Sequence, residues 1–291
     1  MPIEIFAIIA PIFICVAIGY GWARSGASFD SDFVTGLVMN ISAPCLIVGT
    51  LSAVDMPAGH FSEIAKATAL LLLSSLLLFS LLCRVAGWSL RSFLAPLVFP
   101  NTGNMGLPLA MFAFGDKGLA IALGIFMLMS MTHFSLGVAL LSGRSNIRQL
   151  LRTPIVYATL VSILIIYTAV SLPGWLVTTL TSLGNISIPL MLMTLGVSLQ
   201  RLQVGDMLFS ARLAVARLAL GLAIGLGVVW VMDLEGVMRG VVIIQAAMPA
   251  AVFSYLLAHR YQRAAGSIAG MVVISTLLGL LMMPLILWLA L

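Results

Sequence analysis

The sequence predicts an all-helical protein that crosses a membrane many times. Hydrophobic residues make up 62% of its 291 positions and charged residues only 8%, and the mean hydropathy is +1.20. Soluble domains are about 25% charged, so this composition excludes one. Ten apolar runs are each long enough to cross a bilayer as a helix, and one of them is interrupted by prolines, glycines and asparagines.

The ten predicted spans follow one another with short connections. The first begins with an acidic residue, Glu4, and has no basic segment in front of it, so we expect a retained helix rather than a cleaved signal peptide. The sixth and seventh meet at the tight sequence Leu172-Pro173-Gly174. The spans are residues 3–23, 33–53, 64–86, 93–114, 118–142, 155–173, 174–199, 207–232, 239–259 and 266–290.

The basic residues predict that both termini lie outside the cell membrane. In that orientation 11 of the 14 Lys and Arg residues fall in inside loops, as the positive-inside rule requires. The net charge of +5 is therefore a topology signal, and we expect no nucleic-acid partner. The inside residues are Arg24, Arg84, Arg91, Arg144, Arg148, Arg152, Arg201, Arg212, Arg217, Arg260 and Arg263.

The interrupted fourth span carries the strongest functional signal. Proline has no backbone N–H, so Pro108 leaves the carbonyl of Asn104 without its helical partner. Irregular backbone at membrane depth survives only when it is buried in protein or lines a wet cavity, and broken helices mark transporter binding sites. The residues expected to break the helix here are Pro100, Gly103, Gly106 and Pro108, and those expected to bind substrate are Asn101, Thr102 and Asn104.

The chain also repeats itself. The sequence Asn40-Ile41-Ser42-Ala43-Pro44 in the second span recurs as Asn185-Ile186-Ser187-Ile188-Pro189 in the seventh, at an offset of 145. A weaker pairing relates Asn104 and Pro108 to Gln245 and Pro249, at an offset of 141. Five spans per half is an odd number, so the halves enter the membrane in opposite directions. This predicts two inverted five-helix repeats.

In four spans an amide side chain stands four residues before a proline, beside the carbonyl that the proline frees. We expect Gln245 to join the fourth-span residues at the substrate, with Asn40 and Asn185 nearby. Pro44, Pro189 and Pro249 are expected to break their helices. The alternative is that the amides only repair kinked helices, and we favour it for Asn40 and Asn185.

Other polar residues have simpler interpretations. His133 is the ionisable residue placed near the middle of a span, which makes it a candidate for proton coupling. The alternative, which we favour slightly, is a neutral imidazole bonded to a neighbouring helix. Asp30 and Asp32 precede the second span, and we expect a helix start there with Ser31 or Asp32 as N-cap. No buried cation is expected in the spans.

Enzymatic motifs are not found. The sequence contains no His-Glu-x-x-His, Gly-x-Ser-x-Gly, paired-aspartate or P-loop motif. The three cysteines lie in apolar spans and are expected to pack as small hydrophobic residues. We therefore expect no catalytic residue, no metal and no cofactor.

The residues at the fourth-span break resemble a known family. The stretch Pro100-Asn101-Thr102-Gly103-Asn104-Met105-Gly106-Leu107-Pro108-Leu109 resembles the signature of the auxin efflux carrier family, which includes plant PIN carriers and bacterial relatives. Residues 189–196 are similar to its seventh span, and residues 245–249 and 258–261 are similar to its ninth span and the exit from it. The central loop is short, as in bacterial members.

The resemblance implies a specific architecture. The first repeat would be residues 1–143, a cytoplasmic linker residues 144–154, and the second repeat residues 155–291. Spans 1, 2, 6 and 7 would form a scaffold, and spans 3–5 and 8–10 a mobile transport unit in which the broken spans 4 and 9 cross. A bacterial inner-membrane location and a homodimer formed through the scaffold are also implied.

The function implied is secondary transport of a small organic anion, either auxin-like or resembling malate or malonate, by alternating access. Helix N-termini can hold an anion without a buried cation. One alternative is a sodium-coupled symporter of the bile-acid type. A second, from a different class, is an intramembrane enzyme, and a third is a passive channel.

Overall fold

The computed structural model describes the chain except residues 1, 54–57, 143–152, 169 and 203–204. The described part is helical, apart from short connections and one isolated bridge between extended residues. Most of the predicted linker at residues 144–154 lies outside the described residues.

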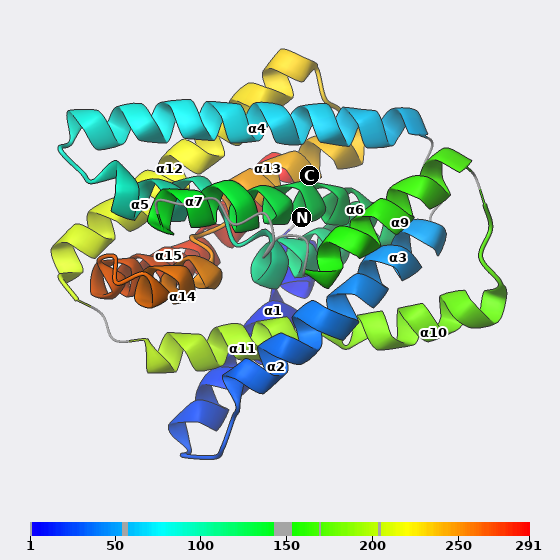
Figure 1. Cartoon of the computed structure of the whole chain (residues 1–291), viewed down its shortest axis with the longest axis horizontal. Helices are drawn as coiled ribbons and strands as arrows, with labels where there is room; N and C mark the ends of the chain where they lie inside the picture. The colour runs from blue at the N-terminus through cyan, green and yellow to red at the C-terminus, as the bar shows by residue number, and fades with distance from the viewer. Residues whose placement is uncertain (1, 54–57, 143–152, 169, 203–204) are drawn as a thin grey trace.

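The first half of the chain forms long apolar helices with π-helical turns inserted in them (Figure 1). Such turns interrupt the regular hydrogen-bond ladder and are frequent at functional sites. The elements are α1 (Pro2–Arg24), α2 (Ser31–Leu37), η1 (Val38–Ser42), α3 (Ala43–Ala53), α4 (Ala58–Val85), α5 (Leu90–Val98), η2 (Thr102–Gly106), α6 (Leu107–Thr132), η3 (His133–Gly137) and α7 (Val138–Ser142).

The second half contains shorter helices as well as long ones. Here α13 and α14 are separated by four non-helical residues, Met248 to Ala251. The elements are α9 (Pro154–Thr168), α10 (Gly174–Asn185), α11 (Ser187–Arg201), α12 (Met207–Met232), α13 (Gly236–Ala247), α14 (Val252–Arg260) and α15 (Ala265–Ala290).

Among the described residues, 7 helices are long and apolar enough to cross a membrane. One of them, Thr102–Ser142, has 41 residues, more than twice the number that a bilayer needs. It bends at Gly115, whose φ of 62° lies in the left-handed region. The bend falls where the sequence predicts the connection between the fourth and fifth spans. Two shorter apolar helices, Pro154–Thr168 and Gly236–Ala247, accompany the seven.

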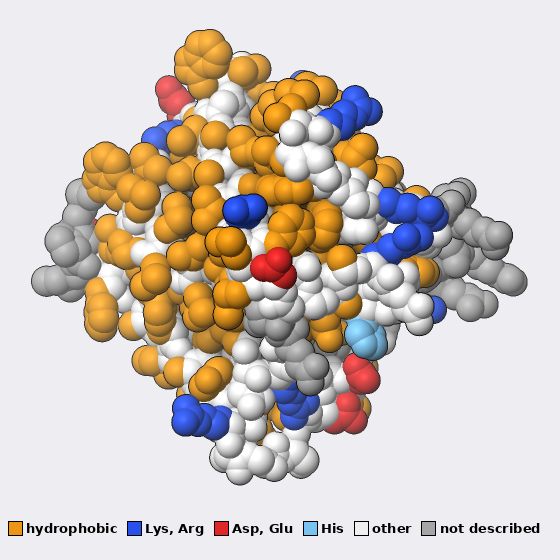
Figure 2. All heavy atoms as spheres, turned by 90° about the vertical axis from the view of Figure 1, so that its left-hand side faces the viewer, with side chains coloured by type: hydrophobic (Ala, Val, Ile, Leu, Met, Phe, Trp, Pro, Cys, Tyr) orange, Lys and Arg blue, Asp and Glu red, His pale blue; other side chains and the backbone are white. Residues whose placement is uncertain are grey.

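The surface is suited to lipid. Large hydrophobic side chains such as Trp230 at 83% exposure and Leu281 at 75% stand on the outside. Figure 2 shows one face on which many hydrophobic side chains lie at the surface, with charged side chains scattered between them and near the edges. Such a surface would aggregate in water and is stable in hydrocarbon, so the protein is an integral, multi-pass membrane protein.

The helices pack in three sets: α1 packs against α11, α3 packs against α9 and α10, and α4, α5, α6, α12, α13 and α15 form a larger set. Contacts of α1 and α3 with α6 join the sets. Close backbone approach joins α1 to α11, because side chains at Gly19 and Gly196 would overlap the backbone of the opposite helix. Small residues at such crossings allow tight packing between membrane helices.

Candidate functional site

Two interruptions of the helices meet inside the protein. The first follows α5 at residues 99–101, and the second follows α13 at residues 248–251. The N–H of Asn101 donates to the carbonyl of Pro249 at 2.7 Å, and the N–H of Ala251 donates to the carbonyl of Phe99 at 3.4 Å. The two extended segments thus satisfy each other's backbone groups in an antiparallel bridge between Pro100 and Ala250.

The bridge pairs Pro100 with Ala250. The sequence pairing of Pro108 with Pro249 at an offset of 141 relates equivalent positions of the two halves and is not a contact, so it stays a prediction.

Pro108 lies at the start of α6, directly after the irregular π-helical turn η2, and its predicted role in breaking the helix stays a prediction. The π-helical turn η2 precedes it, and the N–H of Leu107 bonds the carbonyl of Thr102 five residues back. The chain stays helical from Thr102 through Pro108, but the bond of Leu107 to a carbonyl five residues back and the missing N–H of Pro108 interrupt the regular α-helical hydrogen-bond pattern there.

Asn101 begins the helix after the first interruption. Its side-chain oxygen accepts a hydrogen bond from the N–H of Asn104 at 3.3 Å, which is the usual bond of an N-cap. Its side-chain NH2 has no hydrogen-bond partner, although Asn101 is only 5% exposed. A buried donor without a partner costs free energy, so this group is available to a ligand.

A cavity of about 160 Å³ lies beside the paired interruptions. The N-terminal ends of two helices reach it: η2, capped by Asn101, and α14, which begins after Ala251 without a side-chain cap. Its lining comes from α2, η1, η2, α6, η3, α11 and α14: Ser31, Asp32, Thr35, Met39, Pro100, Asn101, Thr102, Gly103, Asn104, Phe126, Ser130, His133, Phe134, Thr194, Ser198, Ala251, Val252, Phe253 and Leu256.

The lining combines hydrogen-bonding groups with aromatic rings. Phe126, Phe134 and Phe253 supply the rings, and no Lys or Arg is found among the described lining residues. Helix N-termini carry unpaired N–H groups and about half a positive charge each. The cavity therefore combines hydrogen-bond donors and the partial positive charges of two helix ends with apolar walls, and the carboxylate of Asp32 lies in the same lining.

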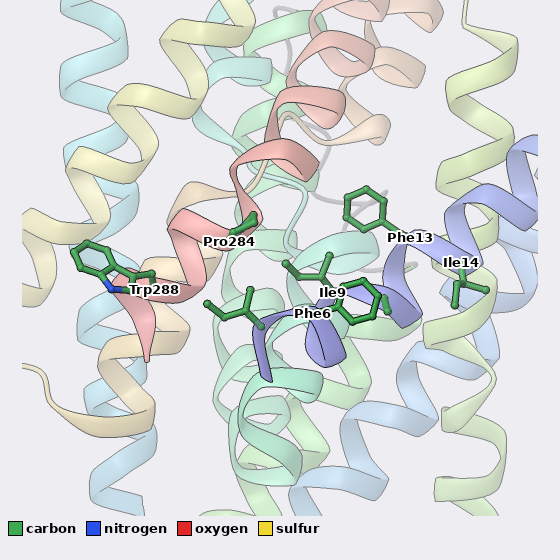
Figure 3. A pocket seen from close by; sticks show the side chains of 8 residues that line it. Phe6, Ile9, Phe13, Ile14, Pro284 and Trp288 are labelled. Atoms are coloured by element: carbon green, nitrogen blue, oxygen red, sulfur yellow. The ribbon is translucent and has the colours of Figure 1, made fainter. Parts of the chain in front are cut away.

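A larger groove of about 710 Å³ on the outside does not share this chemistry. Apolar side chains of α1, among them Phe6, Ile9 and Phe13, line it together with Pro284 and Trp288 of α15 (Figure 3). Phe6 is 71% exposed, as expected for a side chain that contacts lipid. The groove has no charged or amide side chain to bind a polar substrate.

A comparison with known families identifies the class of protein. Residues 139–287 match a family model described as membrane transport protein, which is just over half of the chain. The chain belongs to this family of membrane transport proteins. None of the curated proteins matches it. A transporter moves its substrate without chemical change, so the family membership indicates that the protein is not an enzyme.

In this membrane transport protein, the predicted site residues separate into two sets. Asn101, Thr102 and Asn104 line the cavity, together with Pro100 and Gly103. The remaining predicted polar residues, Asn40, Asn185 and Gln245, are not in the lining.

Gln245 is fully buried, and both its side-chain oxygen and its side-chain nitrogen lack a hydrogen-bond partner. Its amide lies against Gly106, where any added side chain would overlap it.

The repeated Asn-Ile-Ser motifs meet through their serines rather than their asparagines. The hydroxyl of Ser187 donates to the hydroxyl of Ser42 at 2.8 Å, across 145 positions of sequence, and Ser42 donates to the carbonyl of Leu183 at 2.7 Å. Asn40 and Asn185 are exposed. Residues at the repeat offset are thus in direct contact.

His133 lies in the cavity wall at the start of η3. Its Nε2 is 3.3 Å from the hydroxyl of Ser254 on α14. Its ring stacks on Phe99 with centroids 4.3 Å apart and meets Phe253 edge-on at 5.6 Å. The contact with Ser254 joins His133 to a neighbouring helix, and both interpretations of His133 stay predictions.

The cavity residues that were not predicted from the sequence include Asp32, Thr194 and Ser198. Asp32 was expected at a helix start, but the N-cap is Asp30, which accepts from the N–H groups of Asp32 and Phe33. Asp32 is instead free to line the cavity. Thr194 and Ser198 also line it from α11. Their spacing of four residues puts both on one face of a helix, a signal present in the sequence.

The expectation that the spans hold no buried cation is wrong. Arg217, assigned to an inside loop in the sequence analysis, lies within α12 and is only 1% exposed. The helix begins ten residues earlier, at Met207. The count of basic residues in inside loops therefore wrongly included an arginine that is buried within a helix.

Proposed function

We propose that this membrane transport protein is a secondary transporter of small organic anions and that the cavity beside the paired interruptions holds the substrate. One observation carries the proposal: the unpartnered side-chain NH2 of Asn101 and the N-terminal ends of η2 and α14 come together at one cavity. Two helix N-termini contribute about one positive charge in total. That charge suits a single carboxylate.

The rest of the lining suits an apolar body on that carboxylate. Phe126, Phe134 and Phe253 offer ring surfaces. A second carboxylate would find no Lys or Arg in the described lining and would lie in a cavity that Asp32 already shares. We therefore propose monocarboxylates in preference to dicarboxylates such as malate or malonate.

We propose alternating access as the mechanism. The cavity lies between helices of the expected scaffold, α2 and α11, and helices of the expected transport unit, η2, η3 and α14. Movement of one group against the other would open it to either side. The contact of Ser42 with Ser187 at the repeat offset supports the proposal of two inverted five-helix repeats. Broken spans that cross are supported by the bridge between Pro100 and Ala250.

The finer proposals follow the resemblance at residues 100–109. We propose that the protein is a bacterial inner-membrane relative of the auxin efflux carriers, that both termini lie outside, and that the scaffold helices form a homodimer.

Binding and counterflow measurements test the function. Purified protein is heated with each of a panel of organic acids, since a ligand at about 100 times its Kd stabilises the folded state by about 2.7 kcal/mol. Proteoliposomes preloaded with each stabilising acid should then show saturable counterflow. Stabilisation without counterflow would contradict a transporter, and non-saturable flux would favour a channel. Uptake that requires sodium would favour the bile-acid type of symporter.

The orientation is tested by cysteine labelling. In protein lacking Cys15, Cys45 and Cys83, single cysteines at the exposed positions Ser28 and Glu235 should react with an impermeant maleimide from opposite sides. Ser28 should react only after permeabilisation of the cells. Labelling of both positions from the same side would contradict the proposed topology.

His133 allows a test of proton coupling. Because its partners are aromatic rings and one hydroxyl, we expect His133→Gln to keep the bond to Ser254 and to leave the pH dependence of uptake unchanged. The loss of ring stacking should lower thermal stability by about 0.5–1.5 kcal/mol. A flattened pH profile in the variant would instead assign proton coupling to His133.

A further inference from the structure

Arg217 is a charged side chain buried in the membrane-spanning part of the protein. Its Nη1 donates to the carbonyl of Leu97 at 2.9 Å, its Nη2 to the carbonyl of Ala246 at 2.6 Å, and its Nε to the carbonyl of Met248 at 3.3 Å. Its guanidinium carbon lies 5.5 Å from the ring centroid of Phe79. All three hydrogen bonds go to neutral backbone carbonyls. A charge held in this way within a membrane is costly and indicates a functional role.

The three carbonyls share one property: they stand where a helix ends at an interruption. Leu97 is in the last turn of α5, while Ala246 and Met248 are at the end of α13. The last carbonyls of a helix have no helical partner and carry about half a negative charge. Two such ends together carry about one negative charge, which a single guanidinium offsets.

The opposite ends of the same interruptions reach the cavity. After each break the chain starts a new helix, η2 or α14, whose N-terminal end belongs to the cavity lining. The negative C-terminal ends of α5 and α13 are thus bonded to Arg217. The positive N-terminal ends of η2 and α14 are left for a ligand.

We propose that Arg217 is a positioning residue with two effects: it holds the two interrupted segments in register, and it neutralises the negative helix ends so that the positive ends dominate at the cavity. The second effect rests on the proposed function, because it assumes that the cavity binds an anion.

Space for the guanidinium is built into α12. Gly221 lies one turn after Arg217, and a methyl group there would come within 3.0 Å of Nη2 and within 2.6 Å of the carbonyl oxygen of Ala246. Gly221→Ala should therefore disturb both the guanidinium and the carbonyl of Ala246 that it bonds, while keeping the positive charge. It tests the geometry of this contact without a change of charge.

The first test measures the register of the interruptions and needs no substrate. Hydrogen–deuterium exchange should rise in Arg217→Met and Gly221→Ala within residues 97–106 and 246–254, and stay unchanged in α1 and α11. Arg212→Met is the matched control, an exposed arginine on the same helix, and should change neither region. Unchanged exchange in Arg217→Met would overturn the geometric effect. A rise throughout the protein would also overturn it, by showing that Arg217 only supports the fold.

The second test uses phenylacetate and its neutral amide, phenylacetamide, as probes of the purified protein. Arg217→Met should weaken phenylacetate binding roughly tenfold and phenylacetamide binding less than about threefold, since only the anion senses the helix ends. Arg217→Lys keeps the positive charge but loses the set of three hydrogen bonds that the guanidinium makes. It should therefore restore the phenylacetate binding that Arg217→Met loses, while hydrogen–deuterium exchange in residues 97–106 and 246–254 stays raised. Equal losses for both probes would overturn the electrostatic effect. If wild-type protein binds neither probe, the monocarboxylate proposal and the electrostatic effect fail together, while the exchange measurement still decides the geometric effect.

Discussion

Replacing Asn101 by aspartate is expected to abolish binding of a carboxylate substrate while leaving thermal stability near that of the wild type. Aspartate keeps the side-chain oxygen that caps the N–H of Asn104, so the helix start is preserved. It replaces the unpartnered NH2 with a second oxygen and adds a negative charge. A lost hydrogen bond to a charged group costs about 1.5–3 kcal/mol, and repulsion adds to it, so affinity should fall at least about 100-fold.

Two further variants separate the cap from the donor. Asn101→Ala removes both the capping oxygen and the NH2 donor. It should therefore lower the free energy of unfolding by about 1 kcal/mol and also weaken binding of the carboxylate substrate. Asn104→Ala keeps the cap and the donor of Asn101, and should weaken binding by about 1–3 kcal/mol if Asn104 bonds the substrate. Titration calorimetry and thermal unfolding on the same purified protein measure both quantities. Equal affinity in wild type and Asn101→Asp would remove Asn101 from the site.

Gly106→Ala is expected to destabilise the protein strongly. An added methyl group would overlap the amide of Gln245, which is fully buried and has little room to move. Overpacking of this kind costs about 1–3 kcal/mol, and sometimes more. The same substitution at Gly227 is the matched control, because a methyl group there meets nothing within 4 Å; Gly227→Ala should leave the unfolding temperature unchanged or raise it slightly.

A double variant tests the cause. If the clash with Gln245 is responsible, Gly106→Ala combined with Gln245→Ala should be more stable than the sum of the two single effects predicts, by about 0.5–3 kcal/mol. Strictly additive losses of stability would show that the contact between Gly106 and Gln245 is not the reason. Unfolding followed by intrinsic fluorescence in detergent measures all four proteins.

Membrane class and the residues of the main break could be predicted from the sequence because both depend on local composition. Prolines, glycines and amides in an apolar run are unusual enough to identify the segment around Asn101 without a structure. Where the chain leaves the helix could not be predicted, because it depends on the segment that the chain contacts. Pro100 lies in an antiparallel bridge with Ala250, whereas Pro108 follows a π-helical turn at the start of α6.

Arg217, Asp32 and Gln245 illustrate a second limit. A loop arginine and a buried arginine have the same side chain, and only the three carbonyls at the ends of α5 and α13 explain why one is buried within α12. Asp32 was interpreted by its neighbours in sequence, yet the cavity is formed by helices far from it along the chain. Gln245 has the predicted spacing from Pro249 but faces Gly106 instead of the cavity. The spacing of residues in the sequence predicts which of them share a face of a helix. It does not predict which element that face contacts.

The most direct test of the anion site is an experimental structure of the protein with a stabilising monocarboxylate bound. The proposal predicts the carboxylate within hydrogen-bonding distance of the side-chain NH2 of Asn101 and of backbone N–H groups at the start of α14, with the apolar body against Phe126, Phe134 or Phe253. A carboxylate bonded directly to Arg217, or a ligand in the groove between α1 and α15 with the cavity empty, would contradict it.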